Sequence, residues 1–424
     1  MSLLHYTRPN GKRVVVNARD SALTLIEDNT TAFTFDAAGR LVTAFVDGNT
    51  YRRSLANEIV AKRSGDPAGL SRRLRRALPA DEVRRLEECV YAQAARIASE
   101  LASANLPPSG DDSLAAAREA FERVGTYNFD RLQQEAADYL KVYQRIPILP
   151  PDQYLAVVLQ ATEGCSYNAC SFCGFYRDRR FHIKTPDEFH AHVAEVKNFF
   201  GRGLALRRSI FLGDANALII PDDALLPLLD VVNEEFDLLP RGLTLPEAAA
   251  WKAAHPLYFT GIYSFIDAFT TRRKTAQEYA RMAQRGVRRV YVGLETGDAE
   301  LLRFLGKPNT PGDVSELVQQ LKAGGINVGL ILLVGAGGER YAAAHAENTA
   351  SLVSRLPLDS GDVIYLSELI DVPGSTYSAL ARDAGISPLS PEETDRRMAE
   401  LRAALRAGSP GPVVSNYDIR EFMY

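Results

Sequence analysis

The chain has 424 residues, 46% of them hydrophobic and 24% charged, a composition that fits a globular protein with two or three domains. Its formal net charge of −4 excludes a general basic field that would recruit nucleic acid. No signal peptide is evident, and the longest apolar run, at 326–336, is too short to span a bilayer. With only four cysteines, we expect a protein of the reducing cytoplasm, without a membrane partner.

Residues 1–148 are predicted to form an N-terminal α+β accessory domain. Short runs rich in β-branched and aromatic residues predict strands at 13–16, 32–35 and 41–45. Asp36–Arg40, which contains a glycine, predicts the turn of a β-hairpin between the last two runs.

From about residue 55 to residue 143 the spacing of apolar residues predicts helices. Leu70, Leu74 and Leu78 recur on one helical face, and the arginines between them fit a solvated face better than a phosphate-binding patch. Cys89 lies in this stretch and is expected to be buried as a small hydrophobic side chain.

Three of the four cysteines fall within nine positions with the spacing C-x4-C-x2-C: Cys165, Cys170 and Cys173. Thiolates this close on a loop can converge on one soft metal centre, and the spacing also suits an iron–sulfur cluster. A four-iron cluster needs four ligands, so one iron is left for a distant residue or for a ligand that is not protein. A closed zinc site completed by His182 is the alternative, and an odd triplet argues against disulfides.

Around and after the cysteines, strand-like and helix-like segments alternate six times. The expected strands are 154–160, 209–212, 257–263, 289–294, 327–334 and 362–369. Alternating units with apolar strands imply a parallel sheet with helices outside it. We therefore predict an α/β fold, a partial (β/α)6 TIM-like barrel over residues 149–375. A C-terminal helical extension with a docking tail is predicted over 376–424.

The cysteine triplet leaves the first strand of this barrel, with an aromatic residue just before the last cysteine. This arrangement resembles the radical S-adenosylmethionine (SAM) superfamily, and Gly293–Gly297 resembles its Elp3/MiaB/HemN-like branch. The usual spacing there is C-x3-C-x2-C, so this chain has one extra residue. The resemblance implies a [4Fe-4S] cluster on the three cysteines, with SAM bound to the open iron. It also implies reductive cleavage of SAM, a small-molecule substrate, and an electron donor such as flavodoxin or ferredoxin.

The resemblance further implies that SAM is held where the strands end. The residues it implies are Phe172, Gly213, Asp214, Asn216, Glu295, Lys307, Val334 and Gly335. Asp214 or Asn216 would take the amino group of SAM, and Lys307 would pair with its carboxylate. Glu295 would contact the ribose, and the backbone near Phe172 and at Val334–Gly335 would hold the adenine. Each of these glycine-containing loops taken alone also fits a tight turn.

Further residues near the strand ends have two interpretations each. Basic residues beside the cysteines either bind an anionic substrate or screen the cluster: Arg177, Arg179 and Lys184. Other side chains either contact substrate or fill the barrel: Tyr263, Tyr291, Tyr365 and Glu368. The alternatives for function are 3-amino-3-carboxypropyl transfer from SAM, tRNA or RNA modification, and a non-catalytic zinc protein.

Overall fold

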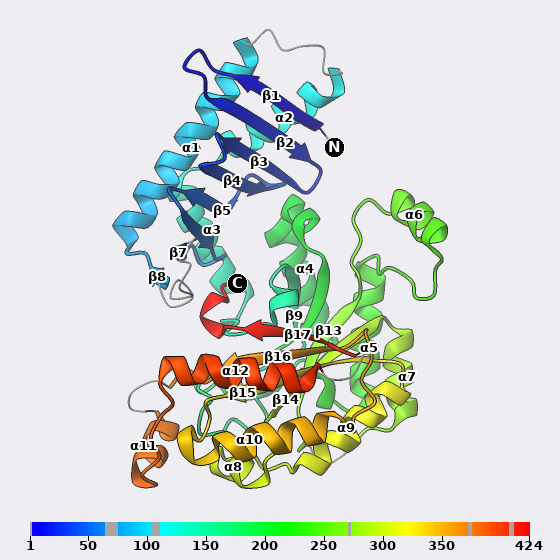
Figure 1. The fold of residues 1–424 in the computed structure, drawn as a ribbon. Helices are drawn as coiled ribbons and strands as arrows, with labels where there is room; N and C mark the ends of the chain where they lie inside the picture. Colours follow the sequence, from blue (N-terminus) through cyan, green and yellow to red (C-terminus); the bar gives the residue numbers. More distant parts are fainter. Residues whose placement is uncertain (1, 64–74, 104–110, 270–272, 372–374, 407–410) are drawn as a thin grey trace. The chain divides into compact units, whose positions relative to one another are not determined.

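The computed structural model describes residues 2–63, 75–103, 111–269, 273–371, 375–406 and 411–424. The chain divides into two compact units (Figure 1). The first comprises Met1–Ile146, Ala194–Arg208 and Met423–Tyr424, and the second comprises Pro147–Val193 and Ser209–Phe422. The segment predicted as a C-terminal extension, up to residue 422, thus belongs to the same unit as the barrel strands.

The first unit contains an antiparallel sheet of eight strands that follow one another in chain order. The strands are β1 (Ser2–Thr7), β2 (Arg13–Arg19), β3 (Ala22–Glu27), β4 (Thr31–Asp36), β5 (Leu41–Val46), β6 (Asn49–Arg53), β7 (Ile59–Arg63) and β8 (Arg75–Ala77). The predicted hairpin is present as β4 and β5. The prediction of helix was wrong for β7 and β8, which pair with each other as antiparallel strands. Leu70 and Leu74 lie outside the described residues.

Three helices complete this unit: α1 (Ala80–Ser103), α2 (Asp111–Gly125) and α3 (Phe129–Val142). Alternate residues of the strands, such as Val14 and Val16 of β2, are buried against apolar residues of α1, such as Val90 and Ile97. This period of two places one face of the sheet in the core. Cys89 is exposed on α1, so the prediction that it is buried was wrong.

The second unit contains a parallel sheet of seven strands, in the order β17-β16-β15-β14-β13-β12-β9. The strands are β9 (Ala156–Gln160), β12 (Ser209–Gly213), β13 (Ile262–Ile266), β14 (Val287–Glu295), β15 (Asn327–Val334), β16 (Val363–Glu368) and β17 (Val413–Tyr417). Most of their residues are buried, as in sheets covered on both faces. The α/β fold with a partial barrel is confirmed, and the tail adds a seventh strand beside β16.

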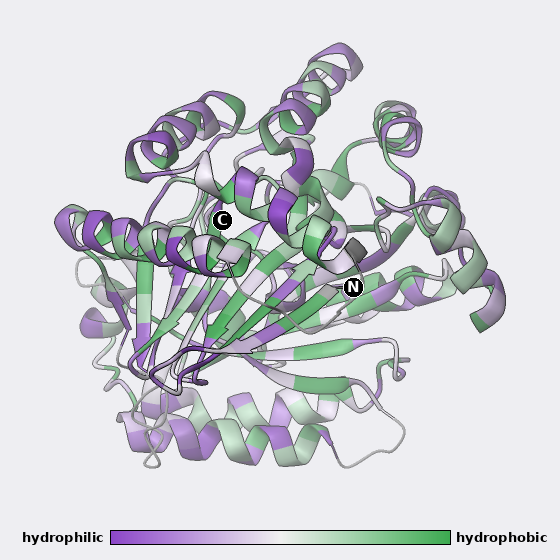
Figure 2. Cartoon of the chain, turned by 90° about the horizontal axis from the view of Figure 1, so that it is seen from above, coloured by the Kyte–Doolittle hydropathy of each residue, from purple (hydrophilic) through white to green (hydrophobic). Residues whose placement is uncertain are grey.

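Helices between these strands cover the sheet (Figure 1). They are α4 (Pro186–Phe200), α5 (Asp222–Glu235), α7 (Ala276–Gln284), α8 (Ala299–Phe304), α9 (Pro311–Ala323), α10 (Gly338–Val353), α11 (Thr376–Asp383) and α12 (Pro391–Leu405). In Figure 2 the helices alternate between hydrophilic and hydrophobic bands, as expected where one face packs on a core. Among the described residues, no helix combines the length and the apolar character needed to cross a membrane.

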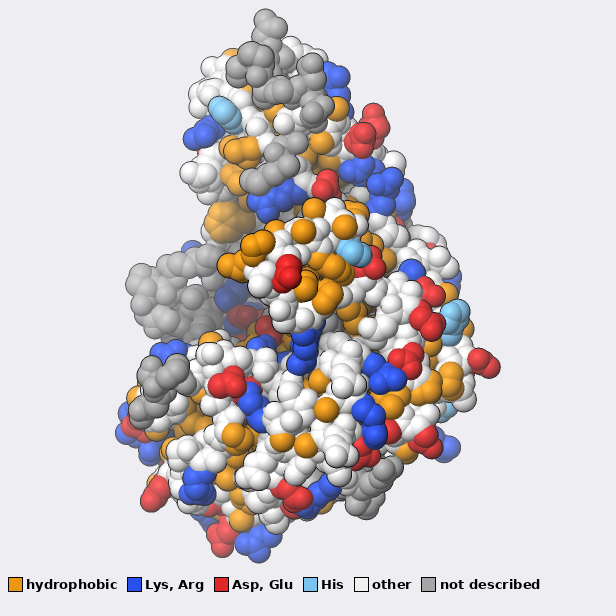
Figure 3. Space-filling model, turned by 90° about the vertical axis from the view of Figure 1, so that its right-hand side faces the viewer, with side chains coloured by type: hydrophobic (Ala, Val, Ile, Leu, Met, Phe, Trp, Pro, Cys, Tyr) orange, Lys and Arg blue, Asp and Glu red, His pale blue; other side chains and the backbone are white. Residues whose placement is uncertain are grey.

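One excursion was not predicted. Helix α6 (Leu245–Ala254) lies before β13, in an insertion whose two ends are joined by a β-bridge between Leu238 and Phe259; we call these two ends the neck. Because the apolar residues at 257–259 are used in this neck, β13 begins five residues later than the predicted strand, at Ile262. No residue of α6 is buried, Leu245 is 89% exposed, and Figure 3 shows apolar side chains gathered where this helix projects.

Candidate active site

The three cysteines lie on a loop that follows the carboxyl end of β9. The short strands β10 (Thr162–Glu163) and β11 (His182–Ile183) pair with each other, so residues 164–181 form an excursion with fixed ends. Cys165, Cys170 and Cys173 all line one cavity of about 220 Å³. Residues that end β14, β15 and β16 line the same cavity, which places it where parallel strands bring reactive groups together.

Hydrogen bonds to distant segments hold the cysteine loop. The backbone N–H and the hydroxyl of Ser171 both donate to the carbonyl of Leu305, each at 3.0 Å. The Tyr167 hydroxyl donates to the carbonyl of Gly306 at 2.8 Å, and the backbone N–H of Tyr377 donates to the carbonyl of Ser171 at 3.1 Å. Protein groups after α8 and at the start of α11 therefore define the course of the loop.

The extra residue between the first two cysteines is accommodated at Asn168. Its φ is +50°, a left-handed conformation that asparagine adopts more readily than most residues. Its carboxamide donates to the carbonyl of Tyr176 at 2.8 Å, and its backbone N–H lies 3.4 Å from the sulfur of Cys165. One local turn thus absorbs the longer spacing.

The side chain of Asp214 stabilises the start of the cysteine loop. Its carboxylate accepts from the Gln160 amide at 2.8 Å and from the backbone N–H of Gly164 at 2.9 Å, and Arg179 lies 3.6 Å away. Burial raises the pKa of Asp214 to about 6. The side chain is committed to the loop, and the described residues that line the cavity include neither Asp214 nor Gly213.

Asn216 is the strand-two residue that does line the cavity. Its amide donates to the Ser166 hydroxyl at 3.1 Å and to the carboxylate of Asp267. Asp267 lines the cavity directly after β13 and was missed from the sequence. The signal was a carboxylate at the end of an apolar strand, but the predicted strand ended at 263, three residues before the end of β13.

Glu295 and Lys307 face each other across the cavity wall. Lys307 Nζ lies 3.0 Å from Glu295 Oε1 and donates to the carbonyl of Gly293 at 2.6 Å. Burial lowers the pKa of Lys307, but the carboxylate of Glu295 and the thiol of Cys170 outweigh it, so the pKa is raised. A Cβ at position 293 would lie 2.3 Å from Glu295 Oε1, so glycine leaves room for the pair.

The adenine contacts implied by the resemblance fall in two places. Phe172 lines the cysteine cavity, whereas Val334 and Gly335 line a neighbouring pocket between β15, β16 and α11. Glu368 lines both. The structure therefore brings together Phe172, Asn216, Glu295 and Lys307 with the three cysteines, and leaves the other implied residues outside that cavity.

The tyrosine candidates mostly fill the barrel. Tyr291 is completely buried and Tyr365 nearly so, and both hydroxyls donate to Asp152, at 2.5 Å and 2.7 Å. Tyr263 does not line the cavity, whereas Ser367 and Tyr417, which the sequence did not single out, do. Tyr417 was missed because the tail was not recognised as a strand.

The basic residues beside the cysteines serve the loop. Arg177 donates to the carbonyl of Cys170 at 3.1 Å, Arg179 lies beside Asp214, and Lys184 pairs with Glu163. These contacts favour support of the loop over recognition of an anionic substrate.

Three thiols that line one cavity suit an iron–sulfur cluster, in which each sulfur binds one iron. Among the described residues, no group of three His, Cys, Asp or Glu side chains is arranged to hold a single metal ion. A zinc ion draws its sulfurs to about 2.3 Å from one centre, whereas a cluster places an iron beneath each sulfur. His182 is half-exposed and lies 3.5 Å from Glu188 instead. Burial raises the pKa of Cys170 to about 12, so its thiol carries a proton that a metal must displace.

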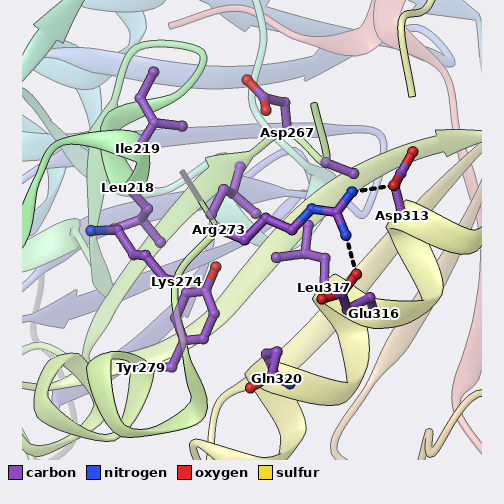
Figure 4. Close-up of a pocket in the computed structure, with 12 residues that line it drawn as sticks. Leu218, Ile219, Asp267, Arg273, Lys274, Tyr279, Asp313, Glu316, Leu317 and Gln320 are labelled. Atoms are coloured by element: carbon purple, nitrogen blue, oxygen red, sulfur yellow. Dashed lines mark hydrogen bonds and ion pairs between the residues drawn. The ribbon is translucent and has the colours of Figure 1, made fainter. Parts of the chain in front are cut away.

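A second, smaller pocket between β13, α7 and α9 has a structural character (Figure 4). Arg273 reaches across it to Asp313 and Glu316 of α9, and Lys274 lies 2.7 Å from Asp222. Because its basic groups are neutralised in this way, the pocket does not compete with the cysteine cavity as a candidate site.

Part of the chain matches a known protein family. Residues 159–347 match the sequence model of the Radical SAM superfamily, and no curated protein matches the chain. Coproporphyrinogen III oxidase (HemN) from Escherichia coli, a radical SAM enzyme, has a TM-score of 0.39 and 14% identity, covering 63% of this chain and 55% of its own. Methylornithine synthase (PylB) has a TM-score of 0.38 and 16% identity, covering 59% and 63%. This chain spans less than two thirds of either protein, and likenesses at these TM-scores establish neither reaction nor substrate.

Proposed function

Because residues 159–347 of this chain form a radical SAM domain, we propose that the enzyme binds one [4Fe-4S] cluster and cleaves SAM reductively to start radical chemistry on a small molecule. The observation that supports this most is the convergence of Cys165, Cys170 and Cys173 on one cavity together with Glu295 and Lys307. The sequence has only one further cysteine, Cys89, and it belongs to the first unit.

The chain's own residues have separable tasks in this proposal. The three thiolates would hold the cluster, and the hydrogen bonds from Ser171 to the Leu305 carbonyl and from the Gly164 N–H to the Asp214 carboxylate position their loop. The cluster and SAM together supply one-electron chemistry that breaks a C–S bond of SAM.

The polar wall of the cavity would orient SAM. The ammonium of Lys307 suits the carboxylate of SAM, the amide oxygen of Asn216 and the carboxylate of Asp267 suit its amino group, and Glu295 suits the ribose hydroxyls. The aromatic ring of Phe172 offers a surface for the adenine. The apolar remainder of the cavity excludes water, and an electron donor such as flavodoxin or ferredoxin would act from the cytoplasm.

The test uses single Cys→Ala variants at 165, 170 and 173, prepared without oxygen, with Cys89→Ala as the matched control. We expect each of the three to lose the visible absorption of the cluster and the dithionite-dependent cleavage of SAM. Cys89→Ala should keep both, because its side chain is exposed on α1. Cleavage that survives in any of the three cavity variants would contradict the proposal.

The products of SAM turnover decide which bond breaks. Release of 5′-deoxyadenosine and methionine supports hydrogen abstraction from a substrate. Release of methylthioadenosine would instead establish 3-amino-3-carboxypropyl transfer, the alternative that the sequence left open.

A further inference from the structure

The inner end of the cysteine cavity is a layer of aromatic rings. Phe265, Tyr291 and Tyr417 line the cavity, and Tyr365 packs between the last two; we call these four residues the aromatic floor. Neighbouring ring centroids are 6.0 Å apart for Phe265 and Tyr291, 6.5 Å for Tyr291 and Tyr365, and 5.7 Å for Tyr365 and Tyr417. The floor therefore crosses the sheet from β13 to β17.

The three tyrosines of the floor use their hydroxyls elsewhere. Those of Tyr291 and Tyr365 donate to Asp152, and that of Tyr417 donates to the carbonyl of Leu149 at 2.7 Å. Asp152 precedes β9 and pairs with Arg289 near the start of β14, so the hydroxyls of Tyr291 and Tyr365 are bound at the opposite end of the strands from the cysteine loop. The floor consequently offers ring carbon, and no hydroxyl, to a molecule in the cavity.

The charges of the cavity disfavour an anion. Among the described residues that line it, Lys307 is the only lysine or arginine, and it is already paired with Glu295. Asp267 and Glu368 add two more carboxylates; Asp267 accepts a hydrogen bond from the Asn216 amide, and Glu368 lies 3.3 Å from Arg420. A phosphate or carboxylate on the substrate would meet net negative charge, and the one cation is the group suited to SAM.

One polar side chain on the inner face remains available. Ser367 is 3% exposed, lines the cavity, and lies directly opposite Leu333 and Tyr417 in the sheet. None of the described hydrogen bonds involves its hydroxyl. A hydroxyl so deeply buried is stabilised by a hydrogen bond, and the cavity is where a partner can come from.

We propose that the substrate is a mainly apolar small molecule without phosphate or carboxylate, whose body lies on the aromatic floor and whose single hydroxyl or amine hydrogen-bonds to Ser367. This inference rests on the proposed function, because it takes the cysteine cavity as the place where substrate meets SAM. Ile331 and Leu333 of β15 complete the apolar wall beside the floor.

Two dyes with the same ring system test the inference. N-phenyl-1-naphthylamine is neutral and has one N–H, and 8-anilinonaphthalene-1-sulfonate adds a sulfonate to the same rings. In cluster-loaded, SAM-saturated protein without oxygen, fluorescence titration should show that the neutral dye binds tighter by about tenfold or more, because the described lining of the cavity carries three carboxylates and one lysine. Equal or tighter binding of the sulfonate would overturn the inference.

Variants locate the bound dye. Ser367→Ala should weaken binding of the neutral dye by about fivefold, the effect of one neutral hydrogen bond, and Ile331→Trp, which fills the cavity, by about tenfold or more. Leu245→Asp removes the exposed apolar side chain of α6 and should leave the affinity unchanged. Binding that is lost in Leu245→Asp, or that ignores both cavity variants, would overturn the assignment.

SAM cleavage is measured on the same samples before dye is added. Loss of cleavage in the unmodified protein would count against the proposed function alone. The dye comparison reports on the cavity and its charge, so the two failures are distinguishable.

Discussion

Single residues at the cavity wall carry the sharpest consequences. Lys307 is 9% exposed and buried beside Glu295, and it is the one lysine or arginine among the described residues that line the cavity. We predict that Lys307→Met weakens SAM binding by about tenfold or more and destabilises the second unit by about 3–5 kcal/mol, because Glu295 loses its partner. Isothermal titration and urea unfolding measure the two effects, with exposed Lys252→Met of α6 as control. Unchanged SAM affinity would contradict the role given to Lys307.

Gly293 is a second informative position. A Cβ there would lie 2.3 Å from Glu295 Oε1 and 3.1 Å from Lys307 Nζ, so alanine must displace the pair. We predict that Gly293→Ala reduces SAM affinity by about tenfold, whereas Gly312→Ala in α9, where the nearest atom is 3.5 Å away, leaves it unchanged. Equal affinities for the two variants would show that the pair does not depend on this space.

Much of the cavity wall was visible in the sequence, because strand ends combine glycine with a polar residue. Asn216 and Glu295 stand at such strand ends, whereas the cysteines were recognised by their spacing and Lys307 was implied only by the resemblance. The role of Asp214 could not be predicted, because only the fold shows that its carboxylate accepts hydrogen bonds from Gly164 and Gln160.

Among the elements, β17 departs most from expectation. Val413–Tyr417 is a short segment with Ser415 and Asn416 inside it, so its apolar pattern is weak, and its partners in β16 lie 50 positions earlier in the chain. Nothing local distinguishes such a strand from an aromatic tail. Its consequence is large, since Tyr417 joins the aromatic floor.

Two variants separate the contributions of Tyr417. Tyr417→Phe removes the hydrogen bond to the carbonyl of Leu149 and should cost about 1 kcal/mol of unfolding free energy. Tyr417→Ala also empties the ring position, where the side chain is 1% exposed, and should cost about 3–5 kcal/mol. Urea unfolding monitored by circular dichroism provides both values. A tail that packs only loosely would instead give two similar, small costs.

At the scale of the whole molecule, two units with separate cores share one chain. The parallel sheet could be predicted because its strands are apolar and alternate with well-capped helices. The eight-stranded sheet of the first unit could only be predicted in part. Its β6 and β8 are short and polar, so their pairing depends on neighbouring strands that no local pattern reveals.

The free energy of unfolding of the first unit should depend on pH because of Glu87. Its side chain is completely buried near Arg53, and burial raises the pKa of Glu87 to about 7, well above the ordinary value of a glutamate. The folded state therefore favours the protonated acid, so the stability that it contributes is full below about pH 4.5 and is lost as the pH rises through 7. We predict that the loss approaches 3 kcal/mol, about 1.4 per pKa unit, and that Glu87→Gln removes it. Urea unfolding of both proteins between pH 4.5 and 8 checks this, and parallel pH profiles would refute it.

The bonds that fix the cysteine loop involve protein atoms alone, from Ser171 to Leu305 and from Tyr377 to Ser171. Small zinc domains, by contrast, unfold when their metal leaves. We expect this loop to keep its course when oxygen destroys the inorganic core. Loss of the cluster would then be reversible. Iron and sulfide could reassemble a cluster on the preformed loop, without synthesis of a new polypeptide.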